Sequence, residues 1–137
     1  MEAAGNNYVV VDFFMPACKY CVQFMPEWNK IVEDFQAEYG DQVQFLKVDG
    51  QSDRYTADRY NIESFPSFII IEPNTYGDAY NQWRPAKRSY TAMKSWIERF
   101  AGNNIHSNKA VDPKSAADLD TLPALLKVGN DSINTNE

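Results

Sequence analysis

Cys18 and Cys21 are the residues of this sequence best suited to covalent chemistry. They are its only cysteines, and they lie three positions apart where a segment of helical spacing begins. A helix N-terminus offers unpaired N–H groups and a partial positive charge, which lower the pKa of a thiol placed there. Lys19 adds a neighbouring positive charge. We therefore expect thiol–disulfide exchange, with the more exposed Cys18 as nucleophile and Cys21 as resolving thiol.

Three other roles for the pair are open to consideration. A structural zinc site needs about four ligands, and the sequence adds only His106 to the two cysteines, so we expect no metal and no cofactor. A purely structural disulfide would close a very short loop and stabilise the fold by only about 2 kcal/mol in the chain-entropy model. Two inert buried thiols are the third alternative, and the position at a helix start argues against them.

Hydrophobic spacing predicts the order β-α-β-α-β-β-α for the elements that position these cysteines. The expected strands are 8–14, 43–48, 67–71 and a fourth between 78 and 83, and the expected helices are 19–39, 52–60 and 89–101. The first two strands are joined through a helix and should be parallel. Ser52 is the expected N-cap of the second helix, and Gly40 and Gly102 are the expected stops of the first and third.

The chain length suits one domain, which we place at residues 8–102. Residues 1–7 form a short leader, and the polar composition of 103–137 predicts a flexible tail or linker. No run of apolar residues is long enough to span a membrane. The net charge of −6, with lysines and arginines scattered, argues against nucleic acid as a partner.

A resemblance to a known family rests on the segment around the cysteines. Residues 9–14 (V-V-V-D-F-F) and 15–21 (M-P-A-C-K-Y-C), with Pro26 five positions later, resemble the active-site region of the thioredoxin superfamily. The flanking residues, including Arg88 before the last helix, resemble protein disulfide isomerases and the thioredoxin domains of sulfhydryl oxidases. The resemblance implies an α/β thioredoxin fold with a central four-stranded mixed sheet flanked by helices. The seven leading residues are too few for the strand and helix that usually open this fold.

Asp12 stands in an otherwise apolar strand, where an unpaired carboxylate is costly to bury. The resemblance implies that Asp12 is a buried proton acceptor for Cys21, with a raised pKa, and that Lys47 on the adjacent strand is its charge partner. The alternative is that Asp12 turns to a solvent-exposed edge.

The resemblance also implies a substrate-binding surface. Phe65-Pro66 falls where the family carries a cis-proline facing the cysteines, which would leave the Phe65 backbone free to pair with an extended peptide. Ala17 replaces the usual Trp before the first cysteine, which removes a flat apolar surface for substrate. Tyr20, between the cysteines, either contacts substrate or is an ordinary solvent-facing residue.

These features predict a protein disulfide isomerase-like oxidoreductase that acts on protein or peptide thiols and disulfides. We expect a monomeric domain. It is either a minimal version of the fold or a fragment of a longer protein, and the polar tail favours the second. The alternative is a peptide-binding or chaperone-like module with weak catalysis; a peroxidase is disfavoured because the thiols lie too close together. The sequon Asn130-Asp131-Ser132 favours the endoplasmic reticulum lumen or secretory pathway, with the cytosol as the alternative.

Overall fold

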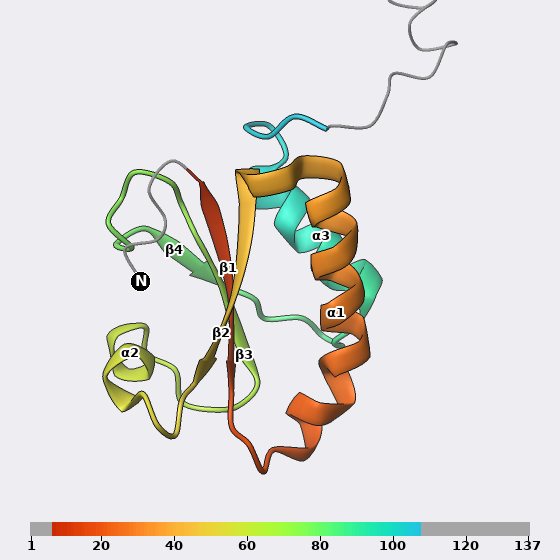
Figure 1. The fold of residues 1–137 in the computed structure, drawn as a ribbon. Helices are drawn as coiled ribbons and strands as arrows, with labels where there is room; N and C mark the ends of the chain where they lie inside the picture. The colour runs from red at the N-terminus through yellow and green to blue at the C-terminus, as the bar shows by residue number, and fades with distance from the viewer. Residues whose placement is uncertain (1–6, 108–137) are drawn as a thin grey trace, which may run out of the picture.

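The computed structural model describes residues 7–107, which form a mixed four-stranded sheet with helices on both faces (Figure 1). Its strands are β1 (Tyr8–Phe14), β2 (Val43–Asp49), β3 (Ser67–Ile71) and β4 (Tyr80–Gln82), in the spatial order β2-β1-β3-β4. β1 pairs parallel to β2 and antiparallel to β3, and β3 pairs antiparallel to β4. The predicted four-stranded mixed sheet and the parallel pairing of its first two strands are confirmed.

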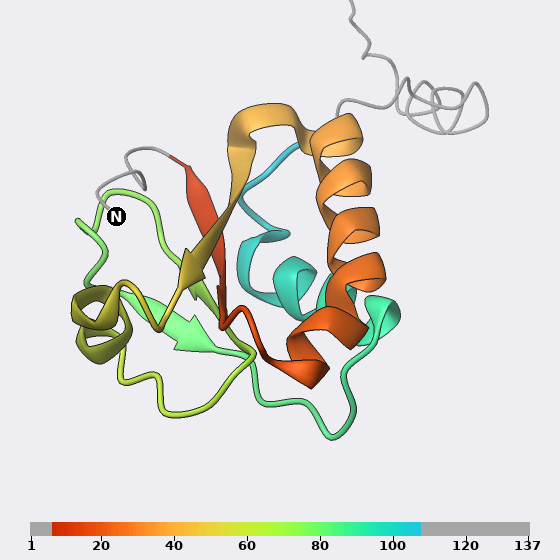
Figure 2. The same ribbon diagram turned by 60° about the horizontal axis from the view of Figure 1, so that its bottom comes forward.

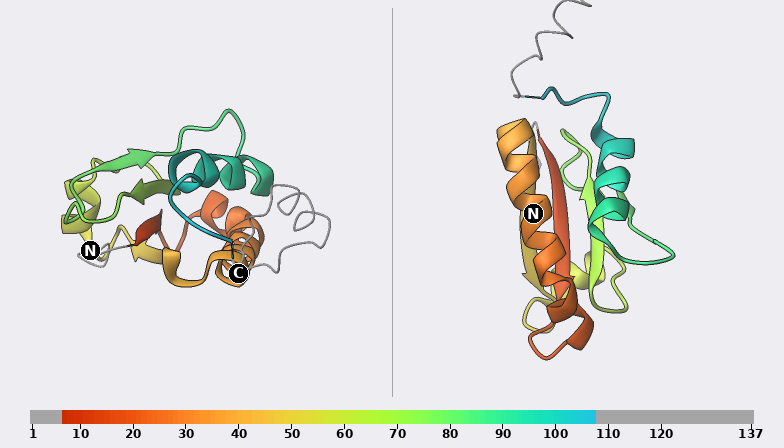
Figure 3. Two further views of the ribbon diagram at one scale, coloured as in Figure 1. Left: turned by 90° about the horizontal axis from the view of Figure 1, so that it is seen from above. Right: turned by 90° about the vertical axis from the view of Figure 1, so that its right-hand side faces the viewer.

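The helices are α1 (Lys19–Tyr39), α2 (Arg54–Arg59) and α3 (Tyr90–Ala101), with a 3-10 turn η2 (Gly40–Gln42) after α1. Figures 1 and 3 show α1 and α3 on one face of the sheet and α2 on the other. Figure 2 brings the lower end of the molecule in Figure 1 forward. The link from β1 into α1 lies at this end of the sheet. This end therefore carries the cysteines.

The N-cap of α2 differs from the expectation. Asp53, not Ser52, caps this helix: its carboxylate accepts hydrogen bonds from the Thr56 N–H at 3.1 Å and the Thr56 hydroxyl at 2.8 Å. Ser52 instead closes the turn after β2, where its N–H donates to a carboxylate oxygen of Asp49. Serine and aspartate can both cap a helix. Here Ser52 is held in the turn by Asp49, so Asp53 is the residue that caps α2.

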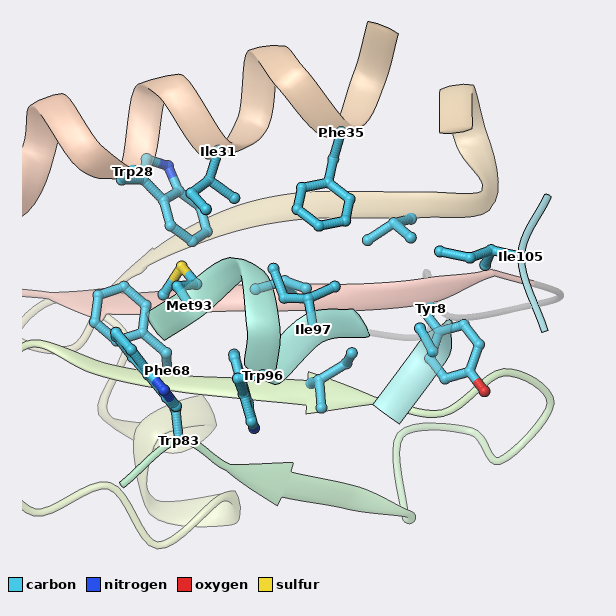
Figure 4. Packing of buried hydrophobic residues seen from close by; sticks show 14 of the residues in the cluster. Tyr8, Trp28, Ile31, Phe35, Phe68, Trp83, Met93, Trp96, Ile97 and Ile105 are labelled. Atoms are coloured by element: carbon cyan, nitrogen blue, oxygen red, sulfur yellow. The ribbon is translucent and has the colours of Figure 1, made fainter. Parts of the chain in front are cut away.

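β1 is buried on both faces, as its lack of polar alternation predicted. Tyr8 and Val10 contribute to the cluster under α1 and α3, whereas Val9, Val11 and Phe13 pack in the cluster on the α2 side. The first cluster is rich in aromatic residues. Figure 4 shows aromatic side chains of this cluster packed between the sheet and the helices, among them Trp28, Phe35, Phe68, Trp83 and Trp96. Each large apolar side chain buried this way stabilises the fold by about 1.5–3 kcal/mol.

The end of the domain lies beyond Gly102, where we expected a tail to begin. Ile105 is only 7% exposed and belongs to the cluster under α1 and α3. Asn104 donates from its amide to the Tyr8 hydroxyl at 2.8 Å, and the Gln42 side chain both donates to the His106 carbonyl and accepts from the His106 N–H, each at 2.7 Å. Residues 103–107 are thus part of the folded unit. Residues 1–6 of the predicted leader (1–7), residues 108–137 of the predicted tail (103–137) and the sequon at Asn130 lie outside the described residues.

Candidate active site

Cys18 and Cys21 lie at the N-terminus of α1 and are joined by a disulfide, with their Cα atoms 5.2 Å apart. Cys18 is the N-cap: its backbone is extended, and its sulfur accepts a hydrogen bond from the Cys21 N–H at 3.1 Å. Cys21, one turn into the helix, is buried, whereas Cys18 is partly exposed. The helix start thus presents one sulfur to solvent and keeps the other behind it, and it offers N–H groups to a thiolate at Cys18.

Asp12 lies beneath α1 on the same sheet face as Val10, because side chains alternate along a strand. It is 6% exposed, and its Oδ1 atom has no hydrogen-bond partner within residues 7–107. Burial raises the pKa of the Asp12 carboxyl to about 6, and the positive charge of Lys47 opposes part of that rise. The solvent-edge alternative for Asp12 is therefore excluded.

Lys47 is the register partner of Asp12 across the β1–β2 pair. Its ammonium group donates to the Met25 sulfur at 3.2 Å and lies 4.8 Å from the centre of the Phe14 ring. No ion pair between Lys47 and Asp12 is present in the described part of the chain. Lys47 thus acts on Asp12 through space and not by direct contact.

Pro66 lies at the end of the sheet that carries the cysteines. β3 runs antiparallel to β1, so its first residue, Ser67, lies opposite Phe13, and Pro66 precedes it beside the link into α1. The Phe65–Pro66 peptide bond is cis, and the Ser67 hydroxyl closes the turn by donating to the Ser64 carbonyl at 2.7 Å. Pro66 is buried and borders a groove of about 220 Å³. The groove is also lined by Phe68, Trp83, Arg84, Pro85 and Arg88.

The Phe65 ring packs against Gly50, directly after β2. A Cβ atom at position 50 would collide with ring atoms Cε1 and Cζ of Phe65. Gly50 itself is tied to the end of β1 by donating its N–H to the Phe14 carbonyl at 2.8 Å. Because Gly50 has no side chain, the Phe65 ring can pack directly against its backbone. The contact between Phe65 and Gly50 helps to position the turn that carries Pro66.

Tyr20 is 57% exposed and borders a second groove, of about 330 Å³, with Gln23, Phe24, Glu27 and Arg88. The Arg88 guanidinium and the Lys19 ammonium each lie 6.0 Å from the centre of the Tyr20 ring. Ala17, just before the nucleophile candidate, is exposed. Arg88 is shared with the Pro66 groove, so the two grooves meet at this residue.

Comparison with known proteins identifies the family. Residues 2–99, which include Asp12, the two cysteines, Lys47 and Pro66, match the family model for thioredoxin. The chain belongs to the thioredoxin family. Its four-stranded α/β architecture is shared with solved thioredoxin-fold structures, which confirms the predicted fold class.

Individual relatives agree with this assignment. The chain is similar to Protein disulfide isomerase-like 1-4 of Oryza sativa subsp. japonica, at 27% identity over 112 residues that cover 80% of this chain and 18% of that protein. The first thioredoxin domain of mouse Protein disulfide-isomerase A4 superposes with a TM-score of 0.62 at 20% identity, covering 82% of this chain and 73% of that domain. The structure of Fasciola hepatica thioredoxin superposes with a TM-score of 0.57 at 24% identity, covering 71% of this chain and 84% of that one. This thioredoxin-family chain spans about a fifth of the length of the protein disulfide isomerases it matches.

The structure gathers most of the predicted site residues at one end of this thioredoxin-family fold. Cys18, Cys21, Ala17, Tyr20 and Pro66 surround the start of α1 and the adjacent end of β3. Asp12 and Lys47 lie below them on neighbouring strands.

Sequence reasoning missed Gly50, Trp83 and Arg84 as parts of this site. One sequence feature could have indicated Arg84: residues 84–88 (R-P-A-K-R) contain three basic side chains and no acidic one. No cluster of three His, Cys, Asp or Glu side chains suited to a metal ion occurs within residues 7–107, and no helix there has the length and apolar character needed to cross a bilayer.

Proposed function

We propose that the chain is a protein disulfide isomerase-like thiol–disulfide oxidoreductase that exchanges disulfides with protein or peptide substrates through Cys18 and Cys21. The observation that carries this proposal is the placement of the pair: Cys18 is the partly exposed N-cap of α1, and Cys21 is buried one turn behind it. A helix N-terminus stabilises the Cys18 thiolate, which is both the attacking and the leaving group of such an exchange.

Starting from the disulfide, a substrate thiolate attacks Cys18. The Cys18–Cys21 bond breaks, a substrate–Cys18 bond forms, and Cys21 leaves as a thiolate that takes up a proton. A second substrate thiolate then attacks the substrate sulfur of this mixed disulfide, and Cys18 leaves as a thiolate. Two substrate thiols have lost two electrons and two protons, and the cysteine pair has become a dithiol. The reverse sequence reduces a substrate disulfide.

Asp12 is the proposed proton acceptor and donor for Cys21. The buried carboxyl lies under α1 with one oxygen free of hydrogen bonds to residues 7–107, and its pKa of about 6 suits proton transfer near neutral pH. In the reducing direction it accepts the proton as Cys21 attacks the mixed disulfide. The rate of that step in wild type and Asp12→Asn, followed from pH 5 to pH 9, tests the role. Identical pH profiles would remove Asp12 from the mechanism.

Substrate binding is proposed for the surface around Pro66. The Phe65 backbone forms no hydrogen bond with other described residues, so its N–H and carbonyl remain for an extended peptide. The neighbouring groove is bordered by Phe68 and Trp83, both of which are largely buried. Exposed Ala17 and Tyr20 flank the reacting sulfur on the other side.

Turnover of disulfides tests the proposal directly. Wild type should reduce insulin with a dithiol donor and accelerate the recovery of scrambled ribonuclease, and Cys18→Ser should abolish both activities. Lys30→Gln, on the exposed surface of α1, is the matched control and should keep both. Activity of Cys18→Ser equal to wild type would overturn the proposed chemistry.

A peptide-binding module with weak catalysis is the second candidate. The groove of about 220 Å³ beside Pro66 favours it, because its apolar and polar lining suits a peptide whether or not exchange occurs. In that case Cys18→Ser would retain its affinity for an unfolded peptide and its suppression of aggregation, and wild type would show no turnover above background.

The endoplasmic reticulum lumen or secretory pathway is the proposed compartment, because disulfide exchange toward oxidation operates in oxidising compartments. The similarity to protein disulfide isomerases supports this placement. A mobility shift that is sensitive to glycosidase and lost in Asn130→Gln would support it. A tagged chain that remains unglycosylated and cytosolic would favour the cytosol instead.

A further inference from the structure

We infer that this domain prefers substrate segments with acidic residues on both sides of the reacting cysteine. The inference rests on the proposed disulfide exchange and specifies its substrate class. The surface concerned is the loop between β4 and α3, residues 83–89, which borders the groove next to Pro66. We refer to it as the basic loop, after Arg84, Lys87 and Arg88.

The charge of the basic loop is opposite to that of the chain as a whole. The net charge is −6, yet no acidic residue occurs between Asp78 and Glu98, while Arg84, Lys87 and Arg88 fall in that interval. All three side chains are exposed. None of them forms an ion pair with another of the described residues, and Arg84 donates only to the neutral amide oxygen of Gln82, at 3.1 Å. Their charges are therefore available to a partner.

The basic loop lies where a substrate peptide would pass. Arg84 and Arg88 line the groove beside Pro66, and Arg88 also lines the groove beside Tyr20, which stands between the cysteines. Among the described residues that line these two grooves, Glu27 is the single acidic one, and it lines the groove beside Tyr20. A peptide whose cysteine reaches Cys18 would thus have flanking residues close to guanidinium groups, which bind carboxylates with paired hydrogen bonds.

The positive surface continues away from the cysteines along α3. A third groove, of about 460 Å³, is lined by Arg84, Lys87 and Arg99 together with Trp83 and Trp96. The two indole rings stack at 5.8 Å, as the neighbouring positions of Trp83 and Trp96 in Figure 4 illustrate. The exposed basic side chains beside this groove match an acidic polypeptide segment. A nucleic acid is the poorer match, because the net charge of −6 repels an extended polyanion at long range.

Two peptide disulfides that differ only in charge test the inference on the full chain. One carries Glu and the other Gln at the two positions on each side of the reacting cysteine, and kcat/KM for exchange is measured for each. Wild type should favour the Glu peptide by about fivefold at low ionic strength, and the preference should shrink as salt is added. The ratio between the two peptides is informative because both react with the same thiol, so a changed Cys18 pKa affects them equally.

Three variants assign the preference to the basic loop. In Arg84→Gln/Arg88→Gln the ratio should fall to about one, and in Arg84→Lys/Arg88→Lys it should be largely retained. Arg54→Gln, which removes an exposed cation from α2 on the other face of the sheet, should keep the wild-type ratio. Equal rates for both peptides in wild type, or an unchanged ratio in the double Gln variant, would overturn the inference. Exchange with neither peptide would instead refute the proposed function.

Discussion

Asp12 and Lys47 lie directly opposite each other on parallel strands β1 and β2, yet no ion pair joins them among the described residues. The Lys47 ammonium instead lies between the Phe14 ring and the Met25 sulfur. The carboxyl group of Asp12 is therefore desolvated without compensation by direct contact, and its pKa rises from 3.8 to about 6. A charged Asp12 costs folding free energy at neutral pH.

Asp12→Asn should therefore stabilise the folded protein above pH 6. A carboxyl whose pKa is raised on folding binds its proton more tightly in the native than in the unfolded state, so stability falls as the pH rises from about 4 to about 6 and stays lower above that range. The gain at pH 7.5 should be about 1–3 kcal/mol and should vanish below pH 4. Denaturant unfolding at both pH values measures it, with the exposed Asp41→Asn as control. Equal stability of wild type and variant at pH 7.5 would contradict the cost assigned to Asp12.

Lys47→Gln should raise the pKa of Asp12 further, because the positive charge that lowers it is removed. The midpoint of the pH-dependent loss of stability should move upward, and the carboxyl resonance of Asp12 should titrate at a higher pH in NMR spectra. Lys30→Gln, on α1, is a suitable comparison because Lys30 lies beside Asp34 and Tyr90. If Lys47→Gln leaves the Asp12 titration in place, the through-space effect of Lys47 is absent.

Gly50→Ala should destabilise the domain by about 1–3 kcal/mol, because the new methyl group meets the Phe65 ring. Gly50 does not adopt a positive φ, so backbone strain does not contribute. In a Phe65→Ala background the ring is gone, and the same change at position 50 should cost much less. Denaturant unfolding of the four proteins of this double-mutant cycle gives the coupling. If the destabilisations caused by Gly50→Ala and Phe65→Ala simply add, contact with the Phe65 ring is not the cause of the destabilisation by Gly50→Ala.

Cys21→Ser should accumulate a mixed disulfide between Cys18 and a substrate peptide, because the thiol that resolves it is missing. Cys18→Ser should form no such adduct at Cys21, which is buried. Incubation with a peptide disulfide followed by mass spectrometry under non-reducing conditions distinguishes the two. Comparable adducts in both variants would exclude the division of roles between the cysteines.

Ile105→Ala should destabilise the full chain by about 2–4 kcal/mol, the usual cost of truncating a buried aliphatic side chain. The exposed neighbour Asn103→Ala should change stability by less than about 0.5 kcal/mol. Thermal or denaturant unfolding of both variants checks the domain boundary. A negligible effect at Ile105 would place the boundary back near Gly102.

The order of elements and the position of the cysteine pair could be predicted from the sequence because they depend on local signals. The apolar run of β1, interrupted only by Asp12, and the helical spacing after Cys18 are such signals. Ile105 gave none, because it is a single apolar residue in a polar stretch. Its neighbour His106 is hydrogen-bonded to Gln42, 64 positions away in the sequence, which local patterns do not indicate.

The walls of the candidate site were predicted less completely for the same reason. Pro66 and Asp12 stand out by residue type, but the contact of Phe65 with Gly50 joins two loops whose sequences do not indicate that they meet. The basic loop was visible as a run of charges, but only the antiparallel pairing of β4 with β3 brings Arg84, which follows β4, beside Pro66, which precedes β3. Long-range placement of this kind follows from sheet topology and not from local spacing.

The hydrogen bond between Asn104 and Tyr8 brings both limits of the folded unit to one pole of the sheet, while β1 delivers the cysteines to the opposite pole (Figure 1). Residues 7 and 107 thus lie at the end of the sheet remote from the sulfurs. A tag or a solid support attached beside residue 7 or residue 107 would therefore leave Cys18 accessible to a substrate.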